Sequence, residues 1–185
     1  MNENQLWNRE QIAQAFRSAH QDFAQTIGKL PAKDFTYSWE QKWTPGQQLV
    51  HITQSVYPVV LALRLPRFVA KLMFGTANRP SKPYANVVTK YQKALKGLTA
   101  AAPKQFQPKA VPFSAQSKVI NSYNKKVEAL AKQVLQTSES DLDAYVLPHP
   151  LVGKLTFREM LCFTVYHVQH HHRITKEILA NIPLN

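Results

Sequence analysis

Apolar residues recur every three or four positions in four long segments of this chain, at residues 8–30, 44–63, 114–137 and 156–180. This spacing places them on one face of an α-helix, where they can pack against other helices. Glycine is scarce, with five among 185 residues, and no Asn-Gly or Gly-rich pair marks a hairpin. The sequence therefore predicts an all-α fold of long amphipathic helices.

Two of these helices have clear start signals. Thr44 is followed by Pro45 and Gln47, and Thr156 is followed by Glu159 three residues later. A threonine with Glu or Gln at this distance forms a capping box, in which each side chain accepts a hydrogen bond from the other residue's backbone amide. We therefore expect the second and the last long helix to begin at these positions.

The middle of the chain is less regular. We expect a short basic helix at residues 67–74 and a polar one at 84–101, the latter as an additional helix in the middle of the chain. Loops are expected at 75–83 and 138–155. Pro58 lies inside the second long helix, so we expect a kink there or a carbonyl group without its helical hydrogen bond.

The length of the chain fits a single domain, residues 1–185, with a sizeable core. The single cysteine, Cys162, excludes an internal disulfide, and its apolar helical surroundings favour a buried thiol. The N-terminal residues show no secretory signal pattern, and no run of about 18 apolar residues forms a transmembrane segment. We therefore expect a cytoplasmic protein without a transmembrane segment.

The charge is unevenly distributed. The net charge is +12, and residues 41–127 contain fourteen Lys and Arg but no Asp or Glu. The resulting positive field could attract nucleic acid, anionic lipid or a small anionic substrate, although a solvated basic face has the same composition. The bases are scattered, and no helix-turn-helix, zinc finger or RNA-binding aromatic motif accompanies them, so we do not expect a nucleic-acid partner.

Four of the seven histidines lie within residues 167–172, inside the last predicted helix. His167 and His171 are one helical turn apart and fall in its apolar row. A buried imidazole needs a hydrogen-bond partner or a metal ion, and two at this spacing can bind one divalent metal ion together. His170 and His172 fall at the edges of the row and are expected to be edge or surface residues.

The best third ligand is His51, about two turns into the second helix. It lies apart from the apolar stripe of that helix, in a mainly polar row made of Gln47, Gln48, Gln54, Ser55 and Pro58. Such a row is typical of a solvated face, yet it could also line a wet cavity inside the bundle, and the helical pattern leaves both interpretations open. His20 and His149 are weaker candidates, with a surface or structural role as the alternative.

Three histidines around one metal ion would leave an open position, as in catalytic metal sites. The metal could lower the pKa of a bound water or hold a thiol as its thiolate, and zinc, nickel and iron all accept imidazole. No general base is obvious, so the catalytic residues stay unknown. Gln47, Gln54 and Glu159 are candidates for supporting or proton-handling groups, although Glu159 falls on the outer face of its helix.

Two motifs resemble those of the DinB/YfiT superfamily. The first is Trp-Thr-Pro-Gly-Gln-Gln-Leu-Val-His-Ile at residues 43–52, and the second joins His-Pro-Leu-Val-Gly-Lys-Leu-Thr at 149–156 to His167 and His171. The resemblance implies a four-helix bundle with an additional helix, often dimeric, in which His51, His167 and His171 hold a divalent metal ion. Characterised relatives include S-transferases that use low-molecular-weight thiols, a thiol-dependent maleylpyruvate isomerase and proteins grouped as metal-dependent hydrolases.

Three functions stay open at this point. The first is a metal-dependent thiol S-transferase or hydrolase acting on a small substrate, which could be anionic because of the basic span. The second is a metal-binding bundle without catalysis, such as a stress-response module, which the lack of an obvious acid–base residue favours. In the third, the basic span and residues 56–74 bind an anionic membrane surface.

Overall fold

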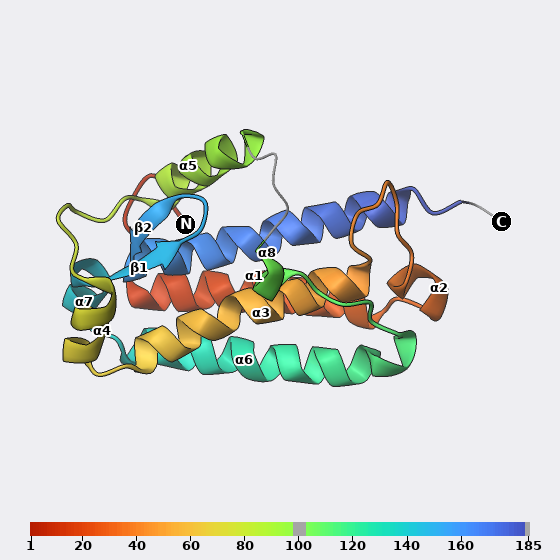
Figure 1. Ribbon diagram of the computed structural model, residues 1–185, viewed down its shortest axis with the longest axis horizontal. Coiled ribbons are helices and arrows are strands. Elements are labelled where there is room, and N and C mark those ends of the chain that lie inside the picture. The colour runs from red at the N-terminus through yellow and green to blue at the C-terminus, as the bar shows by residue number, and fades with distance from the viewer. Residues whose placement is uncertain (98–102, 184–185) are drawn as a thin grey trace.

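The computed structural model describes residues 1–97 and 103–183, and its main feature is a bundle of four long helices (Figure 1). These helices are α1 (Arg9–Gly28), α3 (Pro45–Arg64), α6 (Gln116–Gln136) and α8 (Phe157–Ala180). Helix α6 packs against α1 and α3, and α8 packs against the same two helices. The four periodic segments are therefore the four helices of the bundle, and the all-α prediction is confirmed.

The apolar faces of these helices meet in a continuous core. Phe16 and Phe23 from α1, Leu49 from α3, Leu130 from α6 and Leu161 from α8 have no solvent exposure. Burial of one side chain of this size contributes about 1.5–3 kcal/mol to folding. The packing of amphipathic faces is thus the main force that holds the helices, and the functional side chains on them, in place.

Both predicted capping boxes are present. The Thr44 hydroxyl accepts a hydrogen bond from the amide of Gln47, whose side chain accepts one from the amide of Thr44. Thr156 and Glu159 make the same pair of bonds at the start of α8. Helices α3 and α8 therefore begin where the sequence predicts.

The middle of the chain adds helices around the bundle. Helix α4 (Arg67–Phe74) follows α3 as expected, and α5 (Tyr84–Lys96) packs on α8 as the additional helix. Residues 98–101 of the predicted polar helix lie outside the described residues. Helix α3 continues through Pro58 to its end at Arg64. Three further short helices are α2 (Ala32–Phe35), η1 (Lys104–Phe106) and η2 (Phe113–Ala115).

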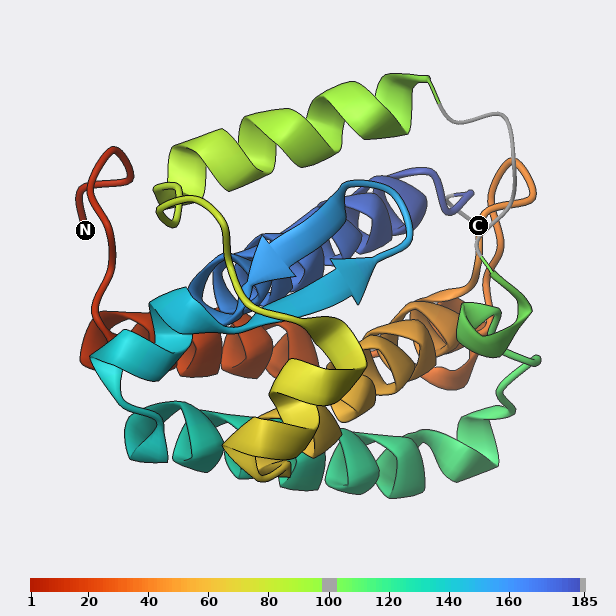
Figure 2. The same ribbon diagram turned by 60° about the vertical axis from the view of Figure 1, so that its left-hand side comes forward.

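The prediction of a loop at residues 138–155 is wrong. This stretch contains α7 (Glu139–Ala144) and an antiparallel hairpin of β1 (Val146–His149) and β2 (Gly153–Thr156). Gly153, with a φ of 73°, occupies the left-handed region that closes a three-residue hairpin turn. Strands of four residues are too short to show a clear alternation, so the pattern missed them. The hairpin lies against α8 on the same side as α5 (Figure 2).

The cysteine and the hydrophobicity of the helices are the subject of two further predictions. The thiol of Cys162 is buried in α8, as predicted, and burial raises its pKa to about 12. It is therefore protonated at neutral pH and is a packing residue rather than a nucleophile. None of the described helices is both long and apolar enough to cross a lipid bilayer.

Candidate metal centre

His51, His167 and His171 come together between α3 and α8. His51 lies about two turns into α3, and the other two are one turn apart on α8. All three side chains are buried, with only 6% to 7% of their surface exposed. One nitrogen from each ring lies within 4.8 Å of the other two. The structure thus brings together the three residues that the sequence analysis selected.

The distances between the ring nitrogens suit a shared metal ion. Nε2 of His167 lies 3.3 Å from Nε2 of His51 and 3.1 Å from Nε2 of His171. Two imidazole nitrogens at about 2.0–2.1 Å from one tetrahedral zinc ion would be about 3.3 Å apart. Both separations from Nε2 of His167 therefore match two ligand atoms on one metal ion.

The start of α3 sets the position of His51. The ring of Phe35 from α2 packs directly on the first turn, where a Cβ atom on Gly46 would come within 2.6 Å of it. The ring of Trp43 lies beside two of the imidazoles, with centroid distances of 4.8 Å to His51 and 6.5 Å to His171. The motif at residues 43–52 thus supplies a helix start, a ligand and one wall of the site.

Hydrogen bonds at the other ring nitrogen orient two of the imidazoles. Nδ1 of His51 lies 2.7 Å from the carbonyl oxygen of Phe106, and Nδ1 of His171 lies 2.5 Å from Oε1 of Gln48. Gln48 donates its amide N–H to the Trp43 carbonyl at 3.1 Å, which leaves Oε1 to face His171. Because both partners are acceptors, both Nδ1 atoms carry the proton and donate it. Nε2 of each ring is then unprotonated, which is the form that binds a metal ion.

Two unprotonated nitrogens therefore face the same nitrogen of His167. A neutral His167 carries at most one proton on Nε2, so it can donate a hydrogen bond to His51 or to His171 but not to both. Without a cation, at least one pair of nitrogens would face each other with lone pairs in a buried, low-dielectric site. A metal ion between the three rings removes this repulsion, so the arrangement fits a bound cation.

Burial also keeps these imidazoles neutral. Loss of hydration lowers the pKa of His51, while its hydrogen bond to Phe106 opposes the shift. Loss of hydration lowers the pKa values of His167 and His171 well below the usual range, and the neighbouring histidines add to the effect. A metal ion can therefore bind at neutral pH without first displacing protons from the rings.

The three imidazoles line a cavity of about 440 Å³. Its walls come from α3, α5, α8, η1 and the turn of the hairpin, and they are mainly apolar. The apolar lining includes Val59, Leu95, Phe106, Pro150, Leu151, Met160 and Phe163. Ser55 and Pro58 line it together with His51. His51 and two members of the polar row, Ser55 and Pro58, therefore face a cavity, and Pro58 is also exposed to solvent.

No carboxylate is among the described residues that line this cavity. Beside the three clustered histidines, its titratable groups are His149, His170 and Tyr91. Burial raises the pKa of Tyr91 to about 12 and lowers that of His149 to about 4. The lining thus offers neutral hydrogen-bonding groups at pH 7 and no carboxylate as general base.

Most of the chain matches one known protein family. The family description of the DinB superfamily matches residues 15–175, a stretch that contains all three histidines. The chain belongs to the DinB superfamily. No curated protein and no solved structure matches it significantly.

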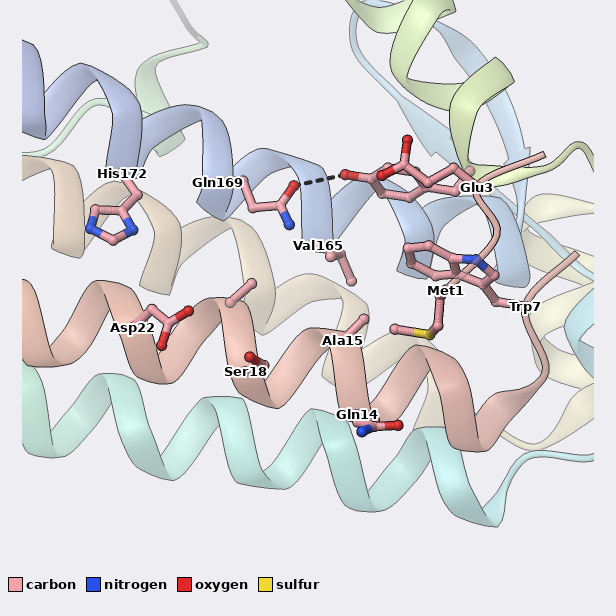
Figure 3. Close-up of a pocket in the computed structure, with 12 residues that line it drawn as sticks. Met1, Glu3, Trp7, Gln14, Ala15, Ser18, Asp22, Val165, Gln169 and His172 are labelled. Atoms are coloured by element: carbon pink, nitrogen blue, oxygen red, sulfur yellow. Dashed lines mark hydrogen bonds between the residues drawn. The ribbon is translucent and has the colours of Figure 1, made fainter. Parts of the chain in front are cut away.

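The other histidines of the DinB protein lie in different surroundings. His20 is buried between α1 and α6, where its Nδ1 is 2.6 Å from the hydroxyl of Tyr123. His172 is half-buried and forms a 2.8 Å hydrogen bond with Thr26. It lines a second cavity of about 340 Å³ between α1 and α8, in which Figure 3 shows Asp22 but no second histidine among the labelled residues. Within the described residues, only the α3 side of α8 combines several imidazoles.

The placement expected for Glu159 is wrong. The helical pattern put it on the outer face of α8, yet its exposed fraction is 1%. Its carboxylate accepts hydrogen bonds from the guanidinium of Arg79 and from the amides of Lys82 and Thr156. Glu159 therefore ties the segment before α5 to the start of α8, and it has no free oxygen for proton transfer in the cavity.

The residues that orient the imidazoles also differ from those expected. Gln47 completes the capping box of α3 and donates to the carbonyl of Pro108, and Gln54 is not among the described residues that line the cavity. Gln48 orients His171 instead. It precedes His51 by three residues and so shares a face of α3 with it, a spacing that could have identified it. The carbonyl of Phe106 comes from the short helix η1, which carries no recognisable sequence motif.

Proposed function

We propose that this DinB protein binds a divalent metal ion through His51, His167 and His171 and acts on a small molecule in the adjoining cavity. The observation that carries the proposal is the convergence of three Nε2 atoms at the cavity wall, two of them unprotonated because their Nδ1 atoms donate elsewhere. Three protein ligands leave room for a water or a substrate atom. Zinc, nickel and iron all suit such a ligand set.

The reaction we propose is the transfer of a low-molecular-weight thiol or a hydrolysis. A metal ion held by these histidines would supply a Lewis acid that lowers the pKa of a bound water or thiol. The chain itself contributes orientation, since Phe106 and Gln48 hold two of the rings, and exclusion of bulk water by the apolar walls. The thiol rests on the resemblance of the two motifs to those of thiol S-transferases.

Elemental analysis of the purified protein tests the metal site. We expect about one equivalent of metal in the wild-type protein and a loss of it in His51→Ala and His171→Ala, with circular dichroism showing that both variants keep their helices. Equal metal content in all three proteins would show that the histidine cluster is not the site. Turnover of thiols with electrophiles, or of activated esters, by the metal-loaded protein then tests the reaction.

A second function is a metal-binding bundle without catalysis. The absence of a carboxylate among the described residues that line the cavity favours it, since most hydrolytic metal sites use a carboxylate or histidine base. This alternative predicts one bound metal ion and no turnover with any thiol or ester. Turnover that disappears in His51→Ala, with the fold retained, would exclude it.

A third function follows from α4, where large apolar side chains are exposed beside basic ones. Phe68, Leu72 and Met73 are 75%, 87% and 60% exposed, and Lys71 is exposed beside them. Arg64, at the end of α3, is also exposed. We propose an anionic lipid surface as the partner of this patch, because apolar groups flanked by cations suit the headgroup region and would repel the same patch of a second copy.

Co-sedimentation with vesicles tests this partner. We expect binding to vesicles that contain phosphatidylglycerol and not to pure phosphatidylcholine, with a loss of binding in Phe68→Ser/Leu72→Ser. Leu135→Ser, which changes an exposed leucine of α6, is the matched control. Binding that ignores the anionic lipid would overturn the proposal, as would a dimer in analytical ultracentrifugation that dissociates in the α4 variant. The homodimer implied by the resemblance stays a prediction that the same measurement tests.

A further inference from the structure

His149 lies at the end of β1 and lines the cavity together with the metal-site histidines. Its Nδ1 accepts hydrogen bonds from the backbone amides of Leu151 and Val152, at 3.1 and 3.4 Å. Because a backbone amide can only donate, Nδ1 must be unprotonated. In the neutral ring the proton is then on Nε2, so the hairpin turn fixes the tautomer of His149.

The Nε2–H group of His149 has no hydrogen-bond acceptor within residues 1–97 and 103–183. The side chain is half-buried and is part of the cavity lining, so a ligand in the cavity can supply the acceptor that the described residues do not. Burial, with the charge of Lys90 as a smaller cause, lowers the pKa of His149 to about 4. The ring is therefore neutral at pH 7 and presents a fixed donor rather than a positive charge.

Aromatic rings separate His149 from the metal-site histidines. The ring of Phe163 lies 4.3 Å from that of His149 and 4.9 Å from that of His167, measured between centroids. The ring of Tyr91 lies 5.9 Å from His149 and 6.3 Å from His167. The donor of His149 and the Nε2 cluster therefore stand one aromatic ring apart along the same cavity.

We propose that His149 is a specificity-determining residue that donates its Nε2–H to a carbonyl or carboxylate oxygen of the ligand in this cavity. The ligand class is a small molecule with a metal-binding atom at one end, such as a thiol sulfur, and an acceptor oxygen several bonds away. Its middle is apolar, to match Leu151, Met160 and Phe163. A cationic ligand does not fit, because no carboxylate among the described lining residues would compensate its charge. This inference rests on the proposed metal site.

Matched ligands on cobalt-loaded protein test the inference, since cobalt(II) reports thiolate binding by its absorption spectrum. The probes are mercaptoacetate, 3-mercaptopropionate and 4-mercaptobutyrate, each paired with the alkanethiol of equal heavy-atom count. We expect one of the acids to bind at least about tenfold more tightly than its alkanethiol, in line with one hydrogen bond to a charged group. In His149→Phe this preference should vanish, while cobalt binding and alkanethiol affinity stay as in the wild type.

His149→Asn is the second variant, because an asparagine oxygen can accept from the amide of Leu151 and so keep the turn, while its amide does not reach the position of Nε2. It should lose the preference as His149→Phe does. In addition, ¹⁵N NMR of the wild-type histidines should show the Nε2–H tautomer of His149 and a shift of that signal when the acid binds.

The outcomes separate the two proposals. If no thiol changes the cobalt spectrum of the wild-type protein, the proposed thiol transfer fails, and with it the ligand class assigned to His149. If the thiols bind and the acids keep the same preference over alkanethiols in both His149 variants, the metal function stands and the role of His149 is overturned. Loss of cobalt from both variants would also overturn it, since His149 would then serve the metal site rather than the ligand.

Discussion

The bundle contains one isolated buried histidine, His20, and a cluster of three buried histidines. Comparing them shows that the role of a buried histidine depends on what its ring nitrogens face. His20 lies between α1 and α6 with 1% of its surface exposed, and one of its nitrogens bonds to the hydroxyl of Tyr123. His51, His167 and His171 are also buried, between α3 and α8, but their Nε2 atoms face one another. Burial lowers the pKa in both places, so burial and pKa alone do not distinguish a structural histidine from a candidate ligand.

The difference lies in the hydrogen-bond partners. Nδ1 of His20 is paired with a hydroxyl, which can donate or accept, and Nε2 of the same ring is buried without a hydrogen-bond partner among the described residues. In the cluster, the acceptors at Phe106 and Gln48 use the ring protons of His51 and His171 on the outer side. The three Nε2 atoms that face one another are then left with lone pairs and with at most one proton, on His167. Convergence of lone pairs, rather than the presence of histidine in a core, is what indicates a metal ion.

The largest effects are expected when one imidazole is removed from the cluster and, separately, when His20 is removed. His171→Ala should lower metal affinity by more than about 100-fold, above the 10- to 100-fold typical of outer partners. His20→Leu should leave metal affinity unchanged and lower the free energy of unfolding by about 1–3 kcal/mol, because the hydroxyl of Tyr123 loses the imidazole and keeps only the backbone carbonyl of residue 20 as a partner. Titration with zinc and urea denaturation measure the two effects. Equal loss of metal in both variants would remove the distinction.

The next largest effect on metal affinity is expected for Gln48, whose side chain orients His171. Gln48→Ala should weaken metal binding by about 10- to 100-fold, because Nδ1 of His171 loses its acceptor. Gln48→Glu keeps an acceptor there and should restore much of the affinity. Gln47→Ala, one position earlier, removes a capping partner only and serves as the control. Similar metal affinities in Gln48→Ala and Gln47→Ala would argue against an orienting role.

The pH dependence of stability tests the lowered pKa of His20 without a metal ion. His20 has a folded pKa of about 3, below the unfolded value of about 6.5. Between these values the unfolded chain binds the additional proton, so stability falls as pH falls, by up to about 1.4 kcal/mol per pH unit for one histidine. Urea denaturation of the metal-free protein between pH 6 and 4.5 should show a shallower slope in His20→Leu than in the wild type. An unchanged slope would contradict the depressed pKa of His20.

The smallest expected effect comes from the partner of His20. Tyr123→Phe removes the hydroxyl but keeps the buried ring, so it should lower the free energy of unfolding by about 1 kcal/mol. Metal affinity should stay at the wild-type value, since Tyr123 is on α6 and bonds only to His20 among the described residues. A loss of metal in this variant would mean that the two groups of histidines are coupled.

Much of the fold was predictable because it depends on local patterns. The apolar period of 3.6 residues marks the four bundle helices, and the two capping boxes mark the starts of α3 and α8. The hairpin of β1 and β2 was missed because four-residue strands carry almost no periodic signal and because the side chain of His149 bridges their turn. Glu159 was misplaced since a helical wheel cannot show that the segment before α5 folds over that face.

The sequence by itself determined which side chains are available: His167 and His171 one turn apart in an apolar row, and His51 two turns into a capped helix. Only the tertiary structure decided that these rings meet, that Ser55 and Pro58 from the polar row of α3 line a cavity, and that the Phe106 carbonyl and Gln48 set the tautomers of His51 and His171. The physical reason is the difference in sequence range between the two properties. Helical periodicity is a local property of the chain, whereas the direction of a ring nitrogen depends on a partner that can be 123 residues away.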